Sequence, residues 1–220
     1  MKGINNVSTL SLIPPLLEGA KVTILITVLG IALGFILAFL AGFGRLSKYR
    51  IVRFITTLYV EVFRGTSLLV QLFWIYFALP HFGIMLPTML SGVLALGLNA
   101  GAYGSEVVRS SILAVPKGQT EASIALNMTP WQRMRIVILP QAFVMMLPAF
   151  GNLQIELLKG TSLVSLITLS DLTFQATLLR SSTFRNTEIF SLLLIMYFLI
   201  AWPLTRGVRW LEHRLSVGRY

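Results

Sequence analysis

The sequence has no cysteine, only two histidines, and few charges for its length of 220 residues. Without cysteine, the chain has no disulfide framework, no thiolate nucleophile and no cysteine metal ligand. The two histidines, His81 and His213, lie far apart in the sequence, which argues against a metal centre. Charged residues make up 12% of the chain, about half of the roughly 25% that is usual in a soluble domain. This composition excludes most soluble metalloenzymes and thiol enzymes.

In place of charge, the chain has long apolar sequence, and 55% of its residues are hydrophobic. Five apolar windows suit the crossing of a hydrocarbon core about 30 Å thick, and the one at 136–158 is interrupted by prolines and polar residues. We therefore predict one domain over residues 1–220, an all-α integral membrane protein with five transmembrane helices. Leu-Pro-His-Phe-Gly at 79–83 predicts a turn between the second and third spans. The predicted spans are 22–43, 68–90, 94–108, 136–158 and 189–204.

The net charge of +10 is distributed as expected for a membrane protein rather than a nucleic-acid-binding protein. If the chain crosses five times, thirteen of the 18 lysines and arginines fall on one side. Cytoplasmic loops are enriched in lysine and arginine, so we predict an outer N-terminus, a cytoplasmic C-terminus and no nucleic-acid partner. Pro14-Pro15 interrupts the first apolar stretch, and residues 1–20 are interpreted as a short outer segment rather than a cleaved signal.

The longest cytoplasmic connection, residues 116–141, has signals for a helix–turn–helix. A first helix is predicted at 119–126, followed by Asn127, a residue type that tolerates the left-handed conformation at a helix C-terminus. Thr129 then suits an N-cap, with Pro130 at the first helical position. Gln132 stands three residues after Thr129 and completes a capping box.

Two roles are open for this hairpin. Its small residues, among them Ala122 and Ala125, suit insertion into a groove of another protein. Alternatively, it could lie on the lipid surface as an amphipathic hairpin, although an interfacial helix usually has a basic face and several aromatic anchors. Only Trp131 is available in the turn as an aromatic anchor.

Two similar motifs place polar residues inside apolar sequence: EVFRGTSLLV at 61–70 and ELLKGTSLVS at 156–165. Gly65 and Gly160 can interrupt a helix, and the Thr-Ser pair after each can cap the helix that resumes. Irregular backbone at membrane depth survives only when it is buried in protein or lines a wet cavity, and broken helices in transporters often mark the solute site. The candidate pathway residues are Thr66, Ser67, Gln71, Asn99, Glu106, Asn152, Glu156, Thr161 and Ser162.

The same residues also permit purely structural roles. Glu61–Arg64, Glu156–Lys159 and Glu106–Arg109 are spaced i, i+3 and could neutralise each other on one helix face. The Gly-Thr-Ser motifs could be ordinary kinks whose hydroxyls bond to carbonyls. The first motif is placed near the cytoplasmic end of its span. The face formed by Asn99, Tyr103 and Glu106 could line a path or pack against a partner chain.

The connection at 116–141 resembles the EAA loop of bacterial ABC importer permeases, whose pattern is Glu-Ala-Ala, three residues, Gly, then a run ending in Ile-x-Leu-Pro. Ser123 replaces the second alanine of that pattern and Asn127 replaces its glycine. Four further stretches are similar to the polar-amino-acid branch of these permeases: 63–77, 102–122, 138–152 and 157–173. The sequences of several motifs are most similar to those of permeases for ectoine and hydroxyectoine. The resemblance implies ATPase-coupling roles for Glu121, Ala122, Ser123, Asn127, Met128, Pro130, Leu139 and Pro140.

The family resemblance implies a division of labour among several proteins. It implies a type I importer fold in the bacterial cytoplasmic (inner) membrane, a second permease chain, a cytoplasmic ABC ATPase dimer and an extracytoplasmic solute-binding protein. Surrounding lipid is the remaining partner. The sequence contains no phosphate-binding G-x-x-x-x-G-K-[ST] motif, so the chain is expected to be a non-enzymatic subunit without a cofactor or metal. ATP and Mg²⁺ would bind to the ATPase. The alternative function is an ion-coupled secondary transporter of amino acids.

Overall fold

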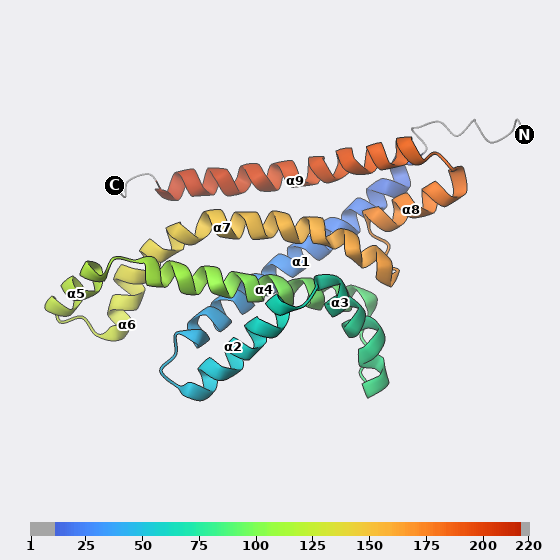
Figure 1. Cartoon of the computed structure of the whole chain (residues 1–220). Coiled ribbons are helices and arrows are strands. Elements are labelled where there is room, and N and C mark those ends of the chain that lie inside the picture. The colour runs from blue at the N-terminus through green and yellow to red at the C-terminus, as the bar shows by residue number, and fades with distance from the viewer. Residues whose placement is uncertain (1–11, 217–220) are drawn as a thin grey trace, which may run out of the picture.

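The computed structural model describes residues 12–216, and within this range the chain is helical with no strand (Figure 1). Most elements are α-helices, two are π-helical (η2 and η4) and two are 3-10 helices (η3 and η5). The predicted all-α class is confirmed. The elements are α1 Ile13–Arg45, α2 Arg50–Gly65, α3 Leu68–Phe73, η2 Trp74–Ala78, η3 Leu79–Phe82, α4 Thr88–Ala114, α5 Lys117–Ala125, α6 Pro130–Gln132, η4 Arg133–Ile138, α7 Leu139–Gly160, η5 Thr161–Ile167, α8 Leu172–Thr183 and α9 Asn186–Ser216.

Helices α1 and α4 form the centre of the fold, because small residues let their backbones approach closely. A Cβ atom added at Gly42 would lie 2.7 Å from Val108, and one added at Gly97 would lie 2.6 Å from Leu33. Such close approach through small residues is characteristic of membrane helix pairs, in which van der Waals packing replaces the hydrophobic driving force. Helix α7 packs on α4, and α9 packs on α7 from outside.

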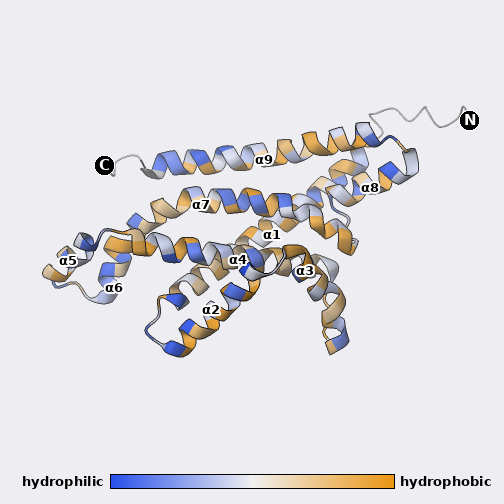
Figure 2. Cartoon of the chain, in the orientation of Figure 1, coloured by the Kyte–Doolittle hydropathy of each residue, from blue (hydrophilic) through white to orange (hydrophobic). Residues whose placement is uncertain are grey.

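Helix α9 leaves most of its apolar surface uncovered, since only 6% of its most apolar window is buried (Figure 2). Leu194, Phe198 and Leu199 are among its exposed side chains. Exposed apolar side chains along a helix of 31 residues are expected where lipid is the solvent. The first helix begins earlier than predicted, because Pro14 and Pro15 occupy its first turn, where a missing N–H costs nothing.

The second span differs from the prediction. The prediction began it at residue 68 and assigned residues 50–65 to a cytoplasmic connection, but α2 and the helix of residues 68–82 together form one bent pair with an angle of 107°. Three arginines and a glutamate in α2 lower its hydropathy, so a search for apolar runs misses it. The predicted turn after this span is confirmed: η3 covers Leu79–Phe82, and Gly83 has a φ of +82°.

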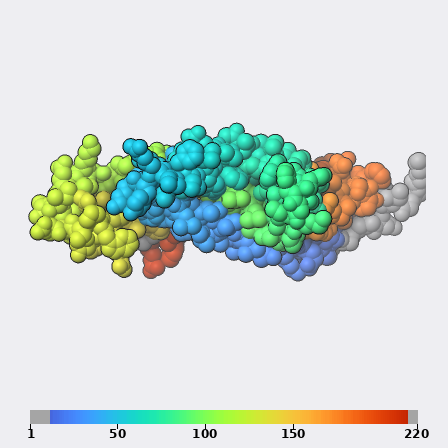
Figure 3. Space-filling model, turned by 90° about the horizontal axis from the view of Figure 1, so that it is seen from below, coloured from blue at the N-terminus to red at the C-terminus, as the bar shows by residue number. Residues whose placement is uncertain are grey.

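Three helical stretches are long and apolar enough to cross a membrane, and the bent pair raises the number to four. Helix α4 falls outside this criterion because glycines, serines and polar side chains such as Asn99 reduce its hydropathy. The predicted number of five spans therefore stays a prediction. Figures 1 and 3 show α5 and α6 projecting from the bundle at one end, where α9 also ends, while α8 lies at the other end.

Candidate functional site

The hairpin of α5 and α6 ends its first helix in a Schellman motif, built as the sequence predicts. Asn127 adopts a left-handed conformation with φ of +58°. Its N–H donates to the carbonyl of Ile124 at 2.9 Å, and the N–H of Met128 donates to the carbonyl of Ser123 at 3.0 Å. These two bonds satisfy carbonyls that the end of a helix otherwise leaves without partners. Asn127 is therefore the residue that sets the direction of the turn.

The second half of the hairpin begins at the predicted capping box. The N–H of Gln132 donates to the hydroxyl of Thr129 at 3.3 Å, while the N–H of Thr129 donates to the side-chain oxygen of Gln132 at 2.9 Å. Pro130 occupies the first helical position. The helix then continues through η4 into α7, so the hairpin is joined to a long membrane helix by continuous helical backbone.

The tip of the hairpin presents apolar side chains to its surroundings. Leu126, Trp131 and Ile124 are 71%, 70% and 57% exposed. Of the predicted coupling residues, Glu121, Ala122, Asn127 and Pro130 are exposed, whereas Met128, Leu139 and Pro140 are partly buried. Ser123 is buried and donates its hydroxyl to the carbonyl of Gln119 at 2.5 Å. The structure thus gives Ser123 an internal role in α5 and leaves its neighbours available to a partner.

The first of the two similar motifs does break its helix. Thr66 and Ser67 are extended, and α3 begins after them. The break leaves the last carbonyls of α2 without intrahelical hydrogen-bond donors, and three side chains donate hydrogen bonds to these carbonyls. Thr66 donates to the carbonyl of Val62 at 2.7 Å, while Gln71 and Asn99 donate to that of Phe63 at 2.8 and 3.2 Å.

Gln71 is the centre of this network. Its amide nitrogen also donates to the hydroxyl of Thr66 at 2.8 Å, and its oxygen accepts from Asn99 at 3.0 Å. Gln71 is buried, so these bonds replace water around a broken helix at membrane depth. The hydrogen bonds therefore give a structural role to three candidate pathway residues. Thr66, Gln71 and Asn99 stabilise the break between α2 and α3.

One detail of the predicted break is wrong. The Ser67 side chain makes no capping bond to α3; the bonds from Gln71 and Asn99 go to the end of α2. The predicted position of the motif near the cytoplasmic end of its span stays a prediction. Its partner Asn99 is near the middle of the 27-residue helix α4.

The second motif does not interrupt its helix, which corrects the predicted cap at Thr161 and Ser162. Gly160 has ordinary right-handed angles (φ −62°, ψ −22°), and the chain tightens into the 3-10 helix η5. Thr161 is fully buried and donates to the carbonyl of Leu158 at 2.7 Å, while Ser162 donates to that of Lys159 at 2.9 Å. Both hydroxyls thus donate to carbonyls of their own turn. The helical backbone continues through Gly160 into η5 without a break.

The two motifs nevertheless meet in space. A Cβ atom at Gly160 would lie 3.2 Å from Leu68, a residue of the first motif. Between them lies a cavity of about 210 Å³. Its polar groups come from α4, α7 and the break between α2 and α3. The lining residues are Thr66, Ser67, Leu68, Leu96, Asn99, Ala100, Tyr103, Leu153, Glu156 and Leu157.

Among the described residues that line this cavity, Glu156 is the one with a charged side chain, and it is exposed. Within residues 12–214, the structure records no ion pair between Glu156 and Lys159 or between Glu61 and Arg64. Asn152, one turn from Glu156 on α7, is exposed but does not line the cavity. A carboxylate at membrane depth without a salt bridge is costly unless it faces water or a ligand.

Glu106 lies outside the cavity and is engaged in ion pairs. It is paired with Arg109 at 2.5 Å, as the i, i+3 spacing predicts, and also with Arg45 from α1. Arg64 of α2 lies 3.8 Å from the same carboxylate and stacks over the ring of Tyr103. The cluster ties α1, α2 and α4 together. Sequence reasoning missed Arg45 and Arg64 here because their partner is 61 and 42 positions away.

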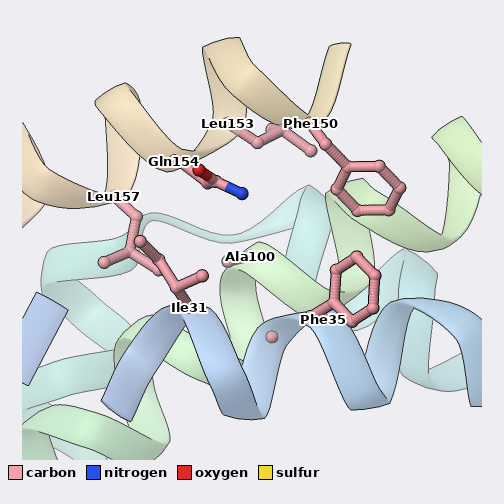
Figure 4. Close-up of a pocket in the computed structure, with 8 residues that line it drawn as sticks. Ile31, Phe35, Ala100, Phe150, Leu153, Gln154 and Leu157 are labelled. Carbon is pink, nitrogen blue, oxygen red and sulfur yellow. The ribbon is translucent and has the colours of Figure 1, made fainter. Parts of the chain in front are cut away.

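A small void of about 20 Å³ lies next to the cavity, between α1, α4 and α7. Figure 4 shows the amide of Gln154 directed toward it, with Ile31 and Leu157 on one side and Phe35 and Phe150 on the other. A space of this size holds at most about one water molecule. It is too small for a solute. The cavity beside Glu156 is the candidate site because polar side chains from α4, α7 and the break line it.

Comparison with known proteins gives a consistent result. Residues 30–217 match the family described as binding-protein-dependent transport system inner membrane component. The chain is 48% identical over 211 residues to the probable amino-acid ABC transporter permease protein y4tF of Sinorhizobium fredii (strain NBRC 101917 / NGR234), covering 93% of this chain and 89% of the relative. It is 39% identical over 207 residues to the glutamine transport system permease protein GlnP of Escherichia coli (strain K12), covering 93% and 94%.

A similar fold occurs in a chain from the crystal structure of an amino acid ABC transporter with histidines. The TM-score is 0.89 at 35% identity, and the match covers 96% of this chain and 99% of the other. The match spans both the bundle and the hairpin, since it extends over nearly the whole of both chains.

Proposed function

The chain belongs to the family of binding-protein-dependent transport system inner membrane components, and from this premise we propose how it works as a permease subunit of an ATP-driven amino-acid importer. Its place is the inner membrane, where several of its helices are apolar enough to span the bilayer. The chain itself provides part of the route for the solute and the hairpin to which the ATPase binds. Relatives are named for glutamine, L-cystine and arginine, so the solute class we propose is a small polar amino acid or a derivative such as ectoine.

The observation that carries the proposal is the continuous helical connection between hairpin and cavity. The hairpin exposes apolar side chains at its tip, and η4 joins it to α7, which presents Glu156 to the cavity. Burial of apolar side chains in a groove of another protein is favourable by about 25 cal/mol per Å². An ATPase dimer that binds ATP and Mg²⁺ and grips two such hairpins would move α7 as a rigid body.

The cavity offers groups suited to a zwitterionic solute. Glu156 can accept hydrogen bonds from an ammonium group, and the hydroxyl of Ser67 on the opposite wall can donate to a carboxylate. A volume of about 210 Å³ is below the roughly 300–1,000 Å³ of drug-sized sites, which fits a small molecule. An extracytoplasmic binding protein would deliver the solute, and a second permease chain, identical or homologous, would complete the path.

The test is uptake by vesicles that contain the chain, its ATPase and its binding protein. We expect uptake only with ATP inside and with a binding protein loaded with its solute; glutamine, cystine, arginine and ectoine are tried in turn. Replacement of Glu156 by glutamine should reduce uptake at least about tenfold, because it removes the only charge in the cavity. Glu18→Gln, at the start of α1 where Glu18 pairs with Lys21, is the matched control. Unchanged uptake in the Glu156 variant would remove this residue from the route.

One observation favours a second candidate, an ion-coupled transporter: the exposed carboxylate of Glu156 at membrane depth. An uncoupler added while ATP is held constant separates the two. Loss of uptake would support ion coupling, and continued uptake would support the ATP-driven importer.

A further inference from the structure

Helix α2 has three faces of different character. Thr56, Tyr59, Val60 and Phe63 pack against α1 and α4, where the hydroxyl of Tyr59 donates to the carbonyl of Leu98 at 2.6 Å. A second stripe, recurring every three or four residues, is apolar and exposed: Ile51, Ile55, Leu58 and Val62. A third stripe recurs with the same period and is polar: Arg50, Arg53, Thr57, Glu61 and Arg64. On a helix, residues with this spacing share one side.

The polar stripe is on the side of α2 that borders the cavity. Arg64 ends the stripe and lies over the ring of Tyr103, which lines the cavity. Thr66 and Ser67, directly after it, line the same cavity. Arg50, at the other end of the stripe, begins α2 five residues after α1 ends, in the connection that the sequence predicts to be cytoplasmic. The stripe therefore runs from this predicted cytoplasmic connection toward the cavity.

The apolar stripe leads to a different place. Val62 and Phe63 line an apolar pocket of about 580 Å³ in the angle between α2 and α3, backed by Leu94 and Leu98 of α4. The two sides of α2 thus open on two environments, a cavity with a carboxylate and hydroxyls, and a pocket with almost entirely apolar walls. Such a separation is expected where one side faces water and the other faces lipid or apolar protein.

Charge favours water over a second copy of the chain as the neighbour of the polar stripe. Three arginines and one glutamate give the stripe a net charge of +2. A two-fold contact places the same patch on both chains, so this stripe against itself would bring two positive patches together out of water. Charged side chains within a membrane protein usually face a water-filled cavity or a charged partner.

We propose that the polar stripe of α2 is one wall of the water-filled inner half of the solute route, which runs from the cavity to the cytoplasm past Glu61, Thr57 and Arg53. Glu156 of α7 lines the cavity across from the break, and Asn152, one turn away on the same side of α7, is exposed as well. The proposal rests on the transport function above but is independent of which amino acid is carried.

The absence of cysteine from the chain makes this testable at single positions. Cysteine is introduced at Glu61 or at its neighbour Val62, and in a second pair at Thr57 or Leu58. Each pair lies at one membrane depth, with one residue on each stripe, and Glu61 and Val62 are both exposed. A charged, membrane-impermeant thiol reagent is added to inside-out vesicles that hold the assembled importer without nucleotide. Labelling of this chain is measured by mass.

We expect labelling at least about tenfold faster for Glu61→Cys than for Val62→Cys, and for Thr57→Cys than for Leu58→Cys, because the reactive thiolate forms in water and not in apolar surroundings. Equal rates within both pairs would overturn the proposal. So would labelling of the Glu61→Cys variant that appears only after the chain is separated from its partner copy, since a protein surface would then cover the stripe.

A second measurement asks whether the water-filled space is also the route of the solute. A bulky adduct on the Glu61→Cys variant should reduce uptake several-fold, whereas an adduct on Val62→Cys should leave it unchanged. Full uptake by a completely modified Glu61→Cys variant would mean that the stripe faces water but does not line the solute route, and this result would refute the proposal. Uptake by the unmodified variants is measured first, so failure of the transport function itself is recognised separately.

Discussion

Replacement of Asn127 by valine perturbs the hairpin at the one residue whose backbone is left-handed. Asn127 has φ of +58°, and a β-branched residue in a sparsely populated backbone region costs about 1–3 kcal/mol. Each 1.4 kcal/mol is a factor of about ten, so the equilibrium constant for the docking geometry should fall about 5- to 150-fold, and the affinity for the ATPase falls with it once other turn geometries predominate. The cost affects an exposed turn and not the bundle, so the variant should still insert into the membrane.

The assay is copurification of the ATPase with the chain over a range of ATPase concentrations, together with solute-stimulated ATP hydrolysis. We expect the concentration for half-maximal copurification to rise by the same factor. Asn127→Gly is the matched control, because glycine adopts positive φ without strain, and it should bind the ATPase as the unsubstituted chain does. Equal binding by the valine and glycine variants would refute the argument that the turn geometry sets the docking surface.

Four further outcomes are expected. Thr129→Ala removes the capping box and should destabilise the start of α6 by about 1 kcal/mol, measured as faster amide exchange in the hairpin; unchanged exchange would contradict the cap. Gln71→Leu leaves the carbonyl of Phe63 with one donor fewer and should lower the stability of the chain in detergent by about 1–3 kcal/mol; unchanged stability would contradict the role of Gln71 at the break. Gly19→Ala should prevent folding or lower the melting temperature strongly, because its Cβ would lie 2.7 Å from the backbone oxygen of Asp171, while Gly65→Ala, with nothing within 4 Å, should be tolerated; similar melting temperatures would refute the packing. Burial raises the pKa of Asp171, the N-cap of α8, from 3.8 to about 6, although N–H bonds from Phe174 and Thr173 act in the opposite direction. The unfolded chain therefore loses this proton first, so the contribution of Asp171 to stability is complete below about pH 4 and is lost as pH rises through 6. An unfolding series from pH 4 to 7 should show this fall in the unsubstituted chain and not in Asp171→Asn.

The hairpin of α5 and α6 was predictable because its signals are local. Asn127, Thr129, Pro130 and Gln132 act within one or two turns of the backbone, and each adopts the predicted conformation. The turn at 79–83 was predictable for the same reason, since proline and glycine restrict the chain at their own positions. The matching of Glu106 with Arg109 also follows from helical spacing alone.

The predictions for the two similar motifs failed where they depended on distant neighbours. The same Gly-Thr-Ser letters break the helix at residue 65 and continue it at residue 160. The difference comes from elsewhere in the chain. Gln71 and Asn99 supply donors to the carbonyls that the first break exposes. At the second motif, the hydroxyls of Thr161 and Ser162 bond to the carbonyls of their own turn.

The sequence by itself determined the apolar helical class, the hairpin between α4 and α7 and the location of its turn, because composition, helical period and capping act over a few residues. Only the tertiary structure decided that α2 and the helix of residues 68–82 form one bent pair, that the two motifs lie on either side of one cavity, and that Glu106 has partners on three helices. These facts depend on which side chains the packing of α1, α4 and α7 brings within hydrogen-bonding distance, and positions that are 40 to 100 residues apart carry no local signal of it.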